Sequence, residues 1–339
     1  MQELFELLRG LVDIPSVTGA EGPCAEFLAA RLRASGFAID KEIVTPGRAN
    51  LFASLGRPEI VLSTHMDTVA PHFSSSEDAE WVHGRGACDA KGSLACQVIA
   101  AEQLAHEGVN DFALLFVVGE ETTSDGARAA NEHPPGSRYL IVGEPTENRL
   151  VVATKGVLQL RLRARGRAAH SAYPELGESA IEKLLDLLAA MRSMPLPGDP
   201  ELGSTTMNIG RISGGVGANV IPAEAEATVL FRTVGDAAGL IRSIEQLVGE
   251  RGECEFLRSV SPTRLERMPG FEADIVAFTT DVPNLDRWGR PLLIGPGSIL
   301  AAHSAEERVS KRELVRAVEL YLRLVKDLKS RGAAGGPRP

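Results

Sequence analysis

Two acidic residues, Glu120 and Glu121, stand side by side directly after an apolar run that closes with Gly119. The run, residues 112–118, is short and rich in Phe and Val, which predicts a buried β-strand. Two carboxylates at the tip of such a strand repel each other and lose hydration. A bound cation or a proton-transfer reaction would offset that cost. The pair is therefore a candidate for chemistry if other residues can bind the same cation.

Residues of the types that bind metals recur at the ends of predicted elements. In chain order they are His65 and Asp67 after a strand at 60–63, Asp89 in a glycine-rich loop at 84–92, Glu144 after a strand at 139–142, and His303 after a strand at 292–294. In open α/β sheets the carboxyl ends of the strands form the binding crevice. Two imidazoles with several carboxylates suit Zn²⁺, or Co²⁺ and Mn²⁺ at similar sites.

Strands and helices alternate through the first half of the chain, which predicts an α/β sheet covered by helices on both faces. The expected strands are 38–44, 51–55, 60–63, 112–118 and 139–142, and the expected helices include 91–107 and 125–131. The α/β character returns near the end, with a helix expected at 272–280, a strand at 292–294 and a last helix from 311 to about 328.

The middle of the chain has a different pattern. Leu158, Leu160 and Leu162 alternate with polar residues, as in a strand with one wet face. The expected order from there is β-α-β-β-α-β, which indicates a small ferredoxin-like domain inserted into the larger one. We therefore expect a first part of the larger domain at 1–155, the insertion at 156–262, a second part of the larger domain at 263–330, and a disordered tail at 331–339.

Composition narrows the class of protein. A length of 339 residues suggests two domains, or one domain with an insertion. The net charge of −9 makes nucleic acid an improbable partner. No apolar run has the length of a membrane span, and the N-terminus lacks a signal-peptide core. The four cysteines are scattered, which favours free thiols. We expect a cytoplasmic protein without nucleic-acid or membrane partners.

Seven short motifs, taken together and in order, resemble those of the M20 metallopeptidase family. They are Ser-Thr-His-Met-Asp-Thr-Val at 63–69, Gly-Arg-Gly-Ala-Cys-Asp-Ala-Lys-Gly at 84–92, Gly-Glu-Glu-Thr at 119–122, Val-Gly-Glu-Pro-Thr at 142–146, Arg-Ala-Ala-His-Ser-Ala at 167–172, Gly-Gly-Val-Gly-Ala-Asn-Val-Ile-Pro at 214–222, and His303. The resemblance covers nearly the whole chain. Segment 295–303 particularly resembles the branch that contains acetylornithine deacetylase.

The resemblance implies an exopeptidase-type α/β catalytic domain, with a mixed sheet flanked by helices, and an inserted ferredoxin-like α+β lid and dimerisation domain. It also implies two divalent metal ions, Zn²⁺ or else Co²⁺. In this scheme Asp89 bridges the ions; His65 and Glu144 complete one site, and Glu121 and His303 complete the other.

The resemblance further implies catalytic roles. Glu120 would be the general base for a metal-activated water. Asp67 would accept a hydrogen bond from the second ring nitrogen of His65 and fix its tautomer. His170 would stabilise the oxyanion from the partner subunit of a homodimer formed through the inserted domain. Asn219 and Arg232 would contact the carboxylate of the substrate, a role that bidentate pairing suits in Arg232.

Each residue also has a plain structural interpretation. The acidic pair could lie in a solvated loop, His65 and Asp67 could shape a turn, and Asp89 could cap a helix. Glu144 could belong to a turn before Pro145, and His303 could be a surface residue beside Glu306 and Glu307. His170 could simply end a strand, Asn219 could form a turn, and Arg232 could lie on the wet face of a strand.

The leading functional hypothesis is hydrolysis of an N-acyl amino acid, such as N-acetylornithine, with release of acetate, as in arginine biosynthesis. The alternatives are deacetylation of N-acetylcitrulline or N-acetyl-lysine, desuccinylation, and a di- or aminopeptidase activity of the same family. A non-catalytic metal-binding scaffold is the most distant alternative. Asp281, just before the last predicted strand, could pair with a cationic substrate side chain or cap a turn before Pro283.

Overall fold

The structure, a computed structural model, describes residues 1–334 and divides into two compact units. The large unit comprises residues 1–152, 265–274 and 280 onward, and the small unit comprises 153–264 and 275–279. Helix α7 (Lys311–Ala334) continues past the predicted start of the disordered tail, so that prediction is wrong for residues 331–334. The rest of the predicted tail, 335–339, lies outside the described residues.

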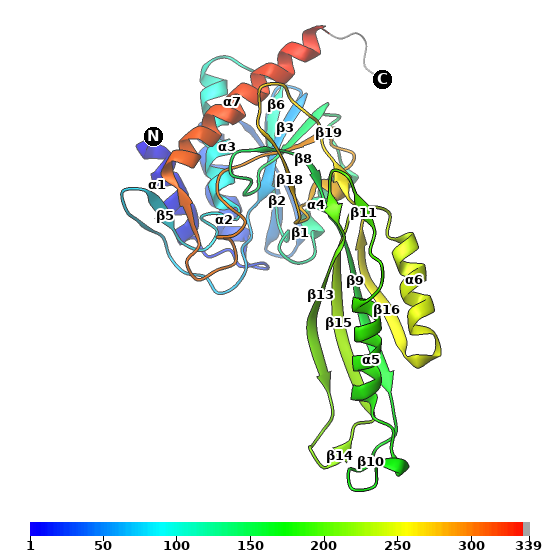
Figure 1. Cartoon of the computed structure of the whole chain (residues 1–339). Coiled ribbons are helices and arrows are strands. Elements are labelled where there is room, and N and C mark those ends of the chain that lie inside the picture. Colours follow the sequence, from blue (N-terminus) through cyan, green and yellow to red (C-terminus); the bar gives the residue numbers. More distant parts are fainter. Residues whose placement is uncertain (335–339) are drawn as a thin grey trace. The chain divides into compact units, whose positions relative to one another are not determined.

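A mixed sheet forms the centre of the large unit (Figure 1). Its strands follow the order β1 (Ala38–Thr45), β2 (Arg48–Leu55), β6 (Phe112–Val117), β3 (Ile60–His65), β7 (Tyr139–Val142), β19 (Arg290–Leu293) and β8 (Leu150–Thr154). The four central strands β6, β3, β7 and β19 are parallel, and the outer strands pair antiparallel. Strands β3 and β6 are buried along their whole length, as expected for parallel strands covered on both faces.

Helices cover both faces of this sheet. Helices α1 (Gln2–Asp13), α2 (Gly22–Ala34), α3 (Lys91–His106) and α7 share one hydrophobic core with the sheet, and α4 (Asp125–Glu132) contacts β1, β2 and β6. Leu51 and Ala53 of β2 belong to that core, while the alternate residues Asn50 and Phe52 face the opposite way. Asn50 hydrogen-bonds the Gly126 carbonyl of α4, which places α4 on the second face.

The register of the parallel strands brings their carboxyl ends to one edge of the sheet. His65, the last residue of β3, pairs with Val117 of β6, while Val142 pairs with Ser63 of β3 and with Leu293 of β19. The segments that follow these strands therefore start within a few residues of one another along the sheet edge. They carry Glu120, Glu121, Glu144 and the loop that leads to His303.

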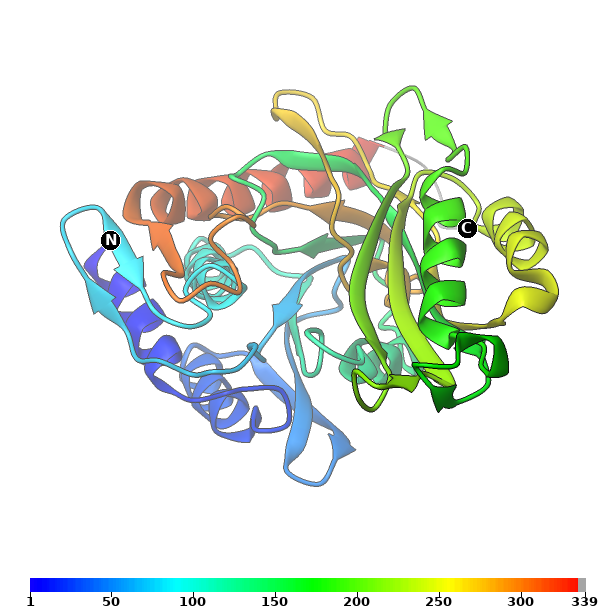
Figure 2. The same cartoon turned by 60° about the horizontal axis from the view of Figure 1, so that its bottom comes forward.

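The small unit is a ferredoxin-like domain. Its elements are β9 (Gly156–Arg165), α5 (Ala180–Arg192), β13 (Thr206–Gly214), β15 (Glu224–Thr233), α6 (Ala238–Val248) and β16 (Glu253–Val260), and its antiparallel sheet has the order β13-β15-β9-β16. Helices α5 and α6, green and yellow in Figure 2, lie side by side on one face, where they share a hydrophobic core with β9 and β15. The expected β-α-β-β-α-β order is present.

Smaller elements connect or extend these units. They are β4 (Ser76–Glu77) and β5 (Trp81–His83), which form a sheet with β20 (Arg308–Ser310); the pair β10 (Ala169–His170) and β14 (Val220–Ile221); the pair β11 (Gly198–Asp199) and β12 (Gly203–Ser204); β17 (Thr263–Arg264); and the 3₁₀ turns Pro174–Leu176, Gly249–Arg251 and Val282–Asn284. No helix among the described residues is long and apolar enough to cross a membrane. All four cysteines are free thiols.

One segment predicted as a helix is a strand in the structure. The segment predicted as a helix at 272–280 contains strand β18 (Ala273–Val276), which pairs with β8. The Leu150 N–H donates to the Glu272 carbonyl, and the Lys155 N–H donates to the Val276 carbonyl. The β-branched residues Ile275 and Val276 favour an extended chain, and β8 supplies the partner that a single short segment cannot provide for itself.

Candidate metal centre

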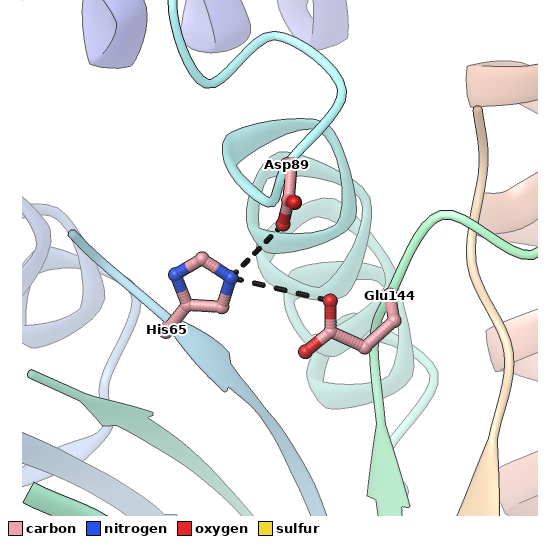
Figure 3. Close-up of side chains that lie close together, drawn as sticks. All are labelled: His65, Asp89 and Glu144. Carbon is pink, nitrogen blue, oxygen red and sulfur yellow. Dashed lines mark hydrogen bonds and ion pairs between the residues drawn. The ribbon is translucent and has the colours of Figure 1, made fainter. Parts of the chain in front are cut away.

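His65, Asp89 and Glu144 form a buried cluster at the sheet edge (Figure 3). The Nε2 atom of His65 lies 3.1 Å from Oδ1 of Asp89 and 4.0 Å from Oε2 of Glu144. His65 ends β3, Glu144 follows β7, and Asp89 comes from the loop before α3, so three separate segments contribute one donor atom each. The side chains of all three are less than a tenth exposed.

Asp89 belongs to a second cluster, with Glu121 and His303. The Nε2 atom of His303 lies 3.3 Å from Oδ2 of Asp89 and 2.9 Å from Oε2 of Glu121. Within each cluster the three candidate donor atoms lie within 4.8 Å of one another. The two carboxylate oxygens of Asp89 thus face different histidines, which is the geometry of a ligand shared between two sites.

The turn that carries the acidic pair is fixed by its surroundings. Gly119 has a φ of 77°, and a Cβ atom there would collide with the carboxylate of Asp125. Asp125 is in turn held by Arg48, which also pairs with the buried Glu21. The requirement for glycine at 119 therefore comes both from its left-handed backbone and from the ion pairs packed against it.

Asp67 contacts the acidic pair as well as His65. Its Oδ1 accepts the N–H of Glu120 at 3.1 Å, and its Oδ2 accepts the N–H of Glu121 at 3.2 Å and the Thr18 hydroxyl at 2.7 Å. Burial alone would raise the pKa of Asp67, but hydrogen bonding and charge from His65, with the other donors, hold it below its usual range. The sequence suggested only the contact with His65, because the backbone N–H groups of a turn leave no trace in residue type.

The tautomer of His65 follows from its Nδ1 contacts. Nδ1 lies 3.0 Å from the carbonyl oxygen of Asp67 and 3.4 Å from its carboxylate Oδ1. Both are acceptors, so Nδ1 carries a hydrogen and a neutral ring leaves the Nε2 lone pair facing Asp89 and Glu144. Asp67 therefore orients His65 chiefly through its backbone oxygen.

Crowding of carboxylates perturbs the ionisation of the cluster. Burial raises the pKa of Glu120 and of Glu144 well above the usual range, and neighbouring acids add to the shift although His65 opposes it. Burial would lower the pKa of His65, but Asp67, Asp89 and Glu144 outweigh it and hold that pKa well above its usual range. Hydrogen bonds to Asp89 and Glu121 raise the pKa of His303 to about 10. The metal-free cluster thus holds protons that a cation can displace.

Glu120 differs from its neighbour in its contacts. Among residues 1–334, no group hydrogen-bonds its carboxylate, whereas Glu121 faces His303. Asp281 is also in the large unit, 3% exposed, with Oδ1 accepting from the Asn284 amide at 3.3 Å. Burial raises the pKa of Asp281 to about 6, and the nearby Ser124, His65 and Asn284 oppose the shift.

Glu307, which the sequence marks only as a neighbour of His303, is 1% exposed. Its Oε1 accepts the N–H groups of Gly86, Cys88 and Asp89 at 3.0, 3.1 and 3.0 Å. Its Oε2 accepts from Nη1 of Arg85 at 2.5 Å. No local sequence signal distinguishes Glu307 from the adjacent exposed Glu306, because the partners of Glu307 lie more than 200 residues earlier in the chain.

In the small unit, the structure brings His170 and Asn219 together. His170 of β10 pairs with Val220 of β14, and the N–H of Ser171 donates to the carbonyl of Asn219 at 3.0 Å. His170 is exposed, and its Nδ1 accepts the N–H of Ala172 at 3.1 Å. The neutral ring therefore carries its hydrogen on Nε2, where it can donate to a negatively charged oxygen.

Arg232 lies away from that pair within the same unit. It is eight residues along β15 from Glu224, a distance of roughly 26 Å at about 3.3 Å per residue, and Figure 1 shows β10 and β14 beyond the opposite end of this sheet. Arg232 alternates with the buried Phe231, so it lies on the face without helices. It is half-buried and makes no ion pair with any residue in 1–334, and burial and the charge of Arg258 lower its pKa.

The two clusters of the large unit match the chemistry of divalent cations. Each offers one imidazole nitrogen and two carboxylates, the donor types that Zn²⁺, Co²⁺ and Mn²⁺ accept. The five donor residues are preassembled on five segments, and the orientation of His65 is already fixed. Glu120 lies beside them with a free carboxylate. Such an arrangement can hold two cations and move a proton next to them.

Comparison of the sequence with known proteins finds members of one family, the M20 peptidases. A family model for the peptidase dimerisation domain of M20 proteins matches residues 152–253. The chain is 38% identical to a peptidase M20 domain-containing protein of Schizosaccharomyces pombe, over 95% of this chain and 84% of that protein. It is 37% identical to a probable carboxypeptidase of Aspergillus fumigatus, over 98% of this chain and 88% of that protein.

A solved structure supports the fold. A tripeptidase from Staphylococcus aureus has a TM-score of 0.81 with 21% sequence identity, covering 95% of this chain and 96% of the other. That likeness concerns the fold, whereas the identity to the two curated relatives extends over nearly the whole chain. The chain therefore belongs to the M20 peptidase family.

Proposed function

We propose that this protein is a metal-dependent hydrolase that cleaves the amide bond to an amino acid with a free α-carboxylate. Carboxypeptidases and N-acyl amino acid deacylases share this reaction and differ in what lies on the acyl side. The observation that carries the proposal is the pair of donor clusters sharing Asp89, with the uncommitted carboxylate of Glu120 beside them. A hydrolase needs such a proton acceptor, whereas a scaffold that only binds metal does not.

Five residues would hold two divalent ions, with Zn²⁺ the first candidate and Co²⁺ the second. Asp89 would bridge the ions, His65 and Glu144 would complete one site, and Glu121 and His303 would complete the other. Bound ions would supply a water of lowered pKa and polarise the acyl carbonyl. His65 suits this role because its Nδ1–H is already engaged by Asp67 and its Nε2 faces Asp89 and Glu144.

Glu120 would carry the proton. It would accept a proton from the attacking water and donate it to the departing amine nitrogen. Burial and the surrounding acids raise its pKa in the metal-free protein, which makes this carboxylate a better proton acceptor than an exposed one. Asp67 would hold the turn through the N–H groups of Glu120 and Glu121, so the base stays in position.

Recognition of the substrate carboxylate is assigned to Arg232 and Asn219. A half-buried guanidinium without a carboxylate partner is the feature expected of an anion-binding residue. Asn219 and Arg232 lie near opposite ends of the sheet of one small unit, so a small carboxylate cannot contact both in the same chain. This separation supports a homodimer in which His170 and Asn219 act on a substrate held by the other subunit.

The deciding experiment is a substrate panel with the metal supplied. The panel contains dipeptides, their N-acetylated forms, and their C-terminally amidated forms. Cleavage that survives N-acetylation and is lost on amidation supports the proposal. The reverse pattern, dependence on a free amine, would identify an aminopeptidase and overturn the proposed specificity. Dialysis against chelator should abolish activity, and Zn²⁺ or Co²⁺ should restore it; full activity without metal would contradict the metal-dependent mechanism.

A second candidate is the deacylation of an N-acetyl amino acid with a cationic side chain, such as N-acetylornithine or N-acetyl-lysine. The buried carboxylate of Asp281 favours it, because a buried carboxylate gains most from a cationic partner. N-acetylcitrulline and an N-succinyl amino acid serve as comparisons. Asp281→Asn should lower kcat/KM for ornithine and lysine derivatives more than for the citrulline derivative; equal effects would remove Asp281 from substrate recognition.

A further inference from the structure

The loop at 84–89 ends at Asp89, the residue that the two candidate metal sites share, and is held by one distant side chain. Glu307 comes four residues after His303 and is buried against this loop. Its Oε1 accepts three backbone N–H groups, those of Gly86, Cys88 and Asp89, all at 3.0–3.1 Å. One oxygen atom therefore fixes the backbone immediately before and at Asp89.

The rest of Glu307 is fixed from the other side. Oε2 accepts from Nη1 of Arg85, and Nε of Arg85 donates to the carbonyl of Pro71 at 3.1 Å. The guanidinium also lies over the ring of Phe73, 4.9 Å from its centroid. The backbone carbonyl of Glu307 accepts the N–H of Gly84 at 3.0 Å. Both ends of the loop thus depend on the same glutamate.

Asp89 is the residue that both candidate metal sites share, so its position determines the geometry of both sites. Its Oδ1 must stay near Nε2 of His65 while its Oδ2 stays near Nε2 of His303. A small shift of the loop backbone would move both oxygens at once. Since Glu307 is close in the chain to His303, the same residue ties the shared carboxylate to the segment that carries one of its partners.

We propose that Glu307 is a positioning residue that holds Asp89 and His303 in register, so that the two metal sites form together. The inference rests on the proposed metal-binding function of Asp89. Partners that orient metal ligands typically contribute ~10–100-fold to metal affinity. A purely structural ion pair between Arg85 and Glu307 would affect unfolding of the large unit without a specific effect on both metal sites.

The test compares Glu307→Gln with Glu306→Gln. Glutamine keeps the size of Glu307 but replaces one acceptor oxygen with an NH₂ group, which cannot serve both the three N–H groups and Arg85. Glu306 is the exposed neighbour and makes none of these contacts, so its variant controls for loss of one charge at the same place. Circular dichroism and thermal unfolding first establish that both variants are folded.

Two measurements follow, both on the metal-free protein. Hydrogen exchange of peptides spanning 84–92 should be faster in Glu307→Gln and unchanged in Glu306→Gln. Titration with Co²⁺, followed by its visible absorption, should show affinity lower by ~10–100-fold for both ions. If Glu307→Gln does not fold, Glu307→Asp keeps the charge toward Arg85 and should weaken Co²⁺ binding less severely.

Wild-type Co²⁺ affinity in a folded Glu307 variant would overturn the inference, and so would an equal loss in Glu306→Gln. Loss of one ion alone would also contradict it, since the shared ligand predicts a joint effect. Failure of the wild-type protein to bind Co²⁺ would instead contradict the proposed function. In that case unchanged exchange at 84–92 would still disprove the positioning of the loop by Glu307.

Discussion

The edge of the large sheet and the sheet of the small unit present functional residues in opposite ways. At the large sheet edge, six residues from five segments converge because parallel strands end together: His65, Asp89, Glu120, Glu121, Glu144 and His303. In the small unit His170 and Asn219 lie at one end and Arg232 lies toward the other. The first group forms an assembled cluster within one unit, whereas the second consists of separated residues for which we propose roles in substrate recognition.

The largest expected effect is the loss of turnover in Glu120→Gln, a variant that should still bind metal in the large unit. Glu120→Gln removes the proton acceptor but leaves all five proposed metal ligands, so turnover should fall ~10²–10⁴-fold. Metal content measured by elemental analysis should remain that of the wild type. The exposed Glu132→Gln serves as control. A Glu120→Gln enzyme with most of its kcat would end the assignment of the base.

His170→Ala tests whether the small unit completes the site. Loss of one oxyanion donor should lower kcat by ~10²–10³-fold with metal content intact. Mixing this variant with Glu120→Gln, under conditions of subunit exchange, should restore activity, because a hybrid dimer pairs an intact Glu120 with an intact His170.

The absence of any recovery after verified exchange would show that His170 does not act across subunits. A strictly monomeric state, as judged by light scattering, would also show that His170 does not act across subunits. His106→Ala, at the exposed end of α3, is the matched histidine control and should leave turnover unchanged.

Arg232→Gln should affect binding more than turnover. A hydrogen-bonded charge contributes roughly 1.5–3 kcal/mol, so KM for substrates with a free carboxylate should rise by ~10–100-fold. Amidated substrates, if cleaved at all, should be nearly insensitive. Arg242→Gln, on the exposed face of α6, provides the control. Equal losses on both substrate types would indicate that Arg232 only supports the sheet.

The smallest expected effect is the pH dependence of metal affinity. The pKa of His303 is raised from 6.5 to about 10 in the metal-free protein, so below pH 10 its proton must leave when a metal binds. Each released proton changes affinity by up to about tenfold per pH unit. Affinity for Zn²⁺ should therefore rise with pH between 6 and 9, and calorimetry in buffers of different ionisation enthalpy should detect proton release.

The same raised pKa has an opposite consequence for the metal-free fold. Protonated His303 stabilises the folded state fully below its unfolded pKa of 6.5, and this contribution is lost as pH rises through about 10. The temperature of unfolding of the chelator-treated protein should decline over that range. A His303→Gln variant should show a weaker decline, and an unchanged profile would contradict the ion pairs with Asp89 and Glu121.

Hydrophobic periodicity was sufficient to locate most of the strands and the inserted ferredoxin-like domain. It failed at 272–280, where β18 is extended because β8 offers a pairing edge and not because the segment has a strong pattern. It also ended α7 too early, since the segment from Arg331 to Ala334 is rich in glycine and alanine and carries little periodic signal.

Residue types at strand ends were sufficient to suggest that these acids and histidines converge, and the resemblance to the M20 family grouped them into two donor clusters. They were insufficient for Glu307, whose surroundings in sequence are polar and read as an exposed loop. The same holds for the backbone contacts of Asp67, because hydrogen bonds to N–H groups do not depend on which side chain the donor residue carries.

The order of elements and the chemistry of the donors are thus properties of the sequence alone, because both arise from local patterns of apolar and ionisable residues. The tertiary structure decided which loops meet, that Asp89 faces two histidines, and that Glu307 holds it from 218 positions away. It also placed Arg232 apart from His170 and Asn219. These relations depend on strand register and on contacts between distant loops, which no local pattern encodes.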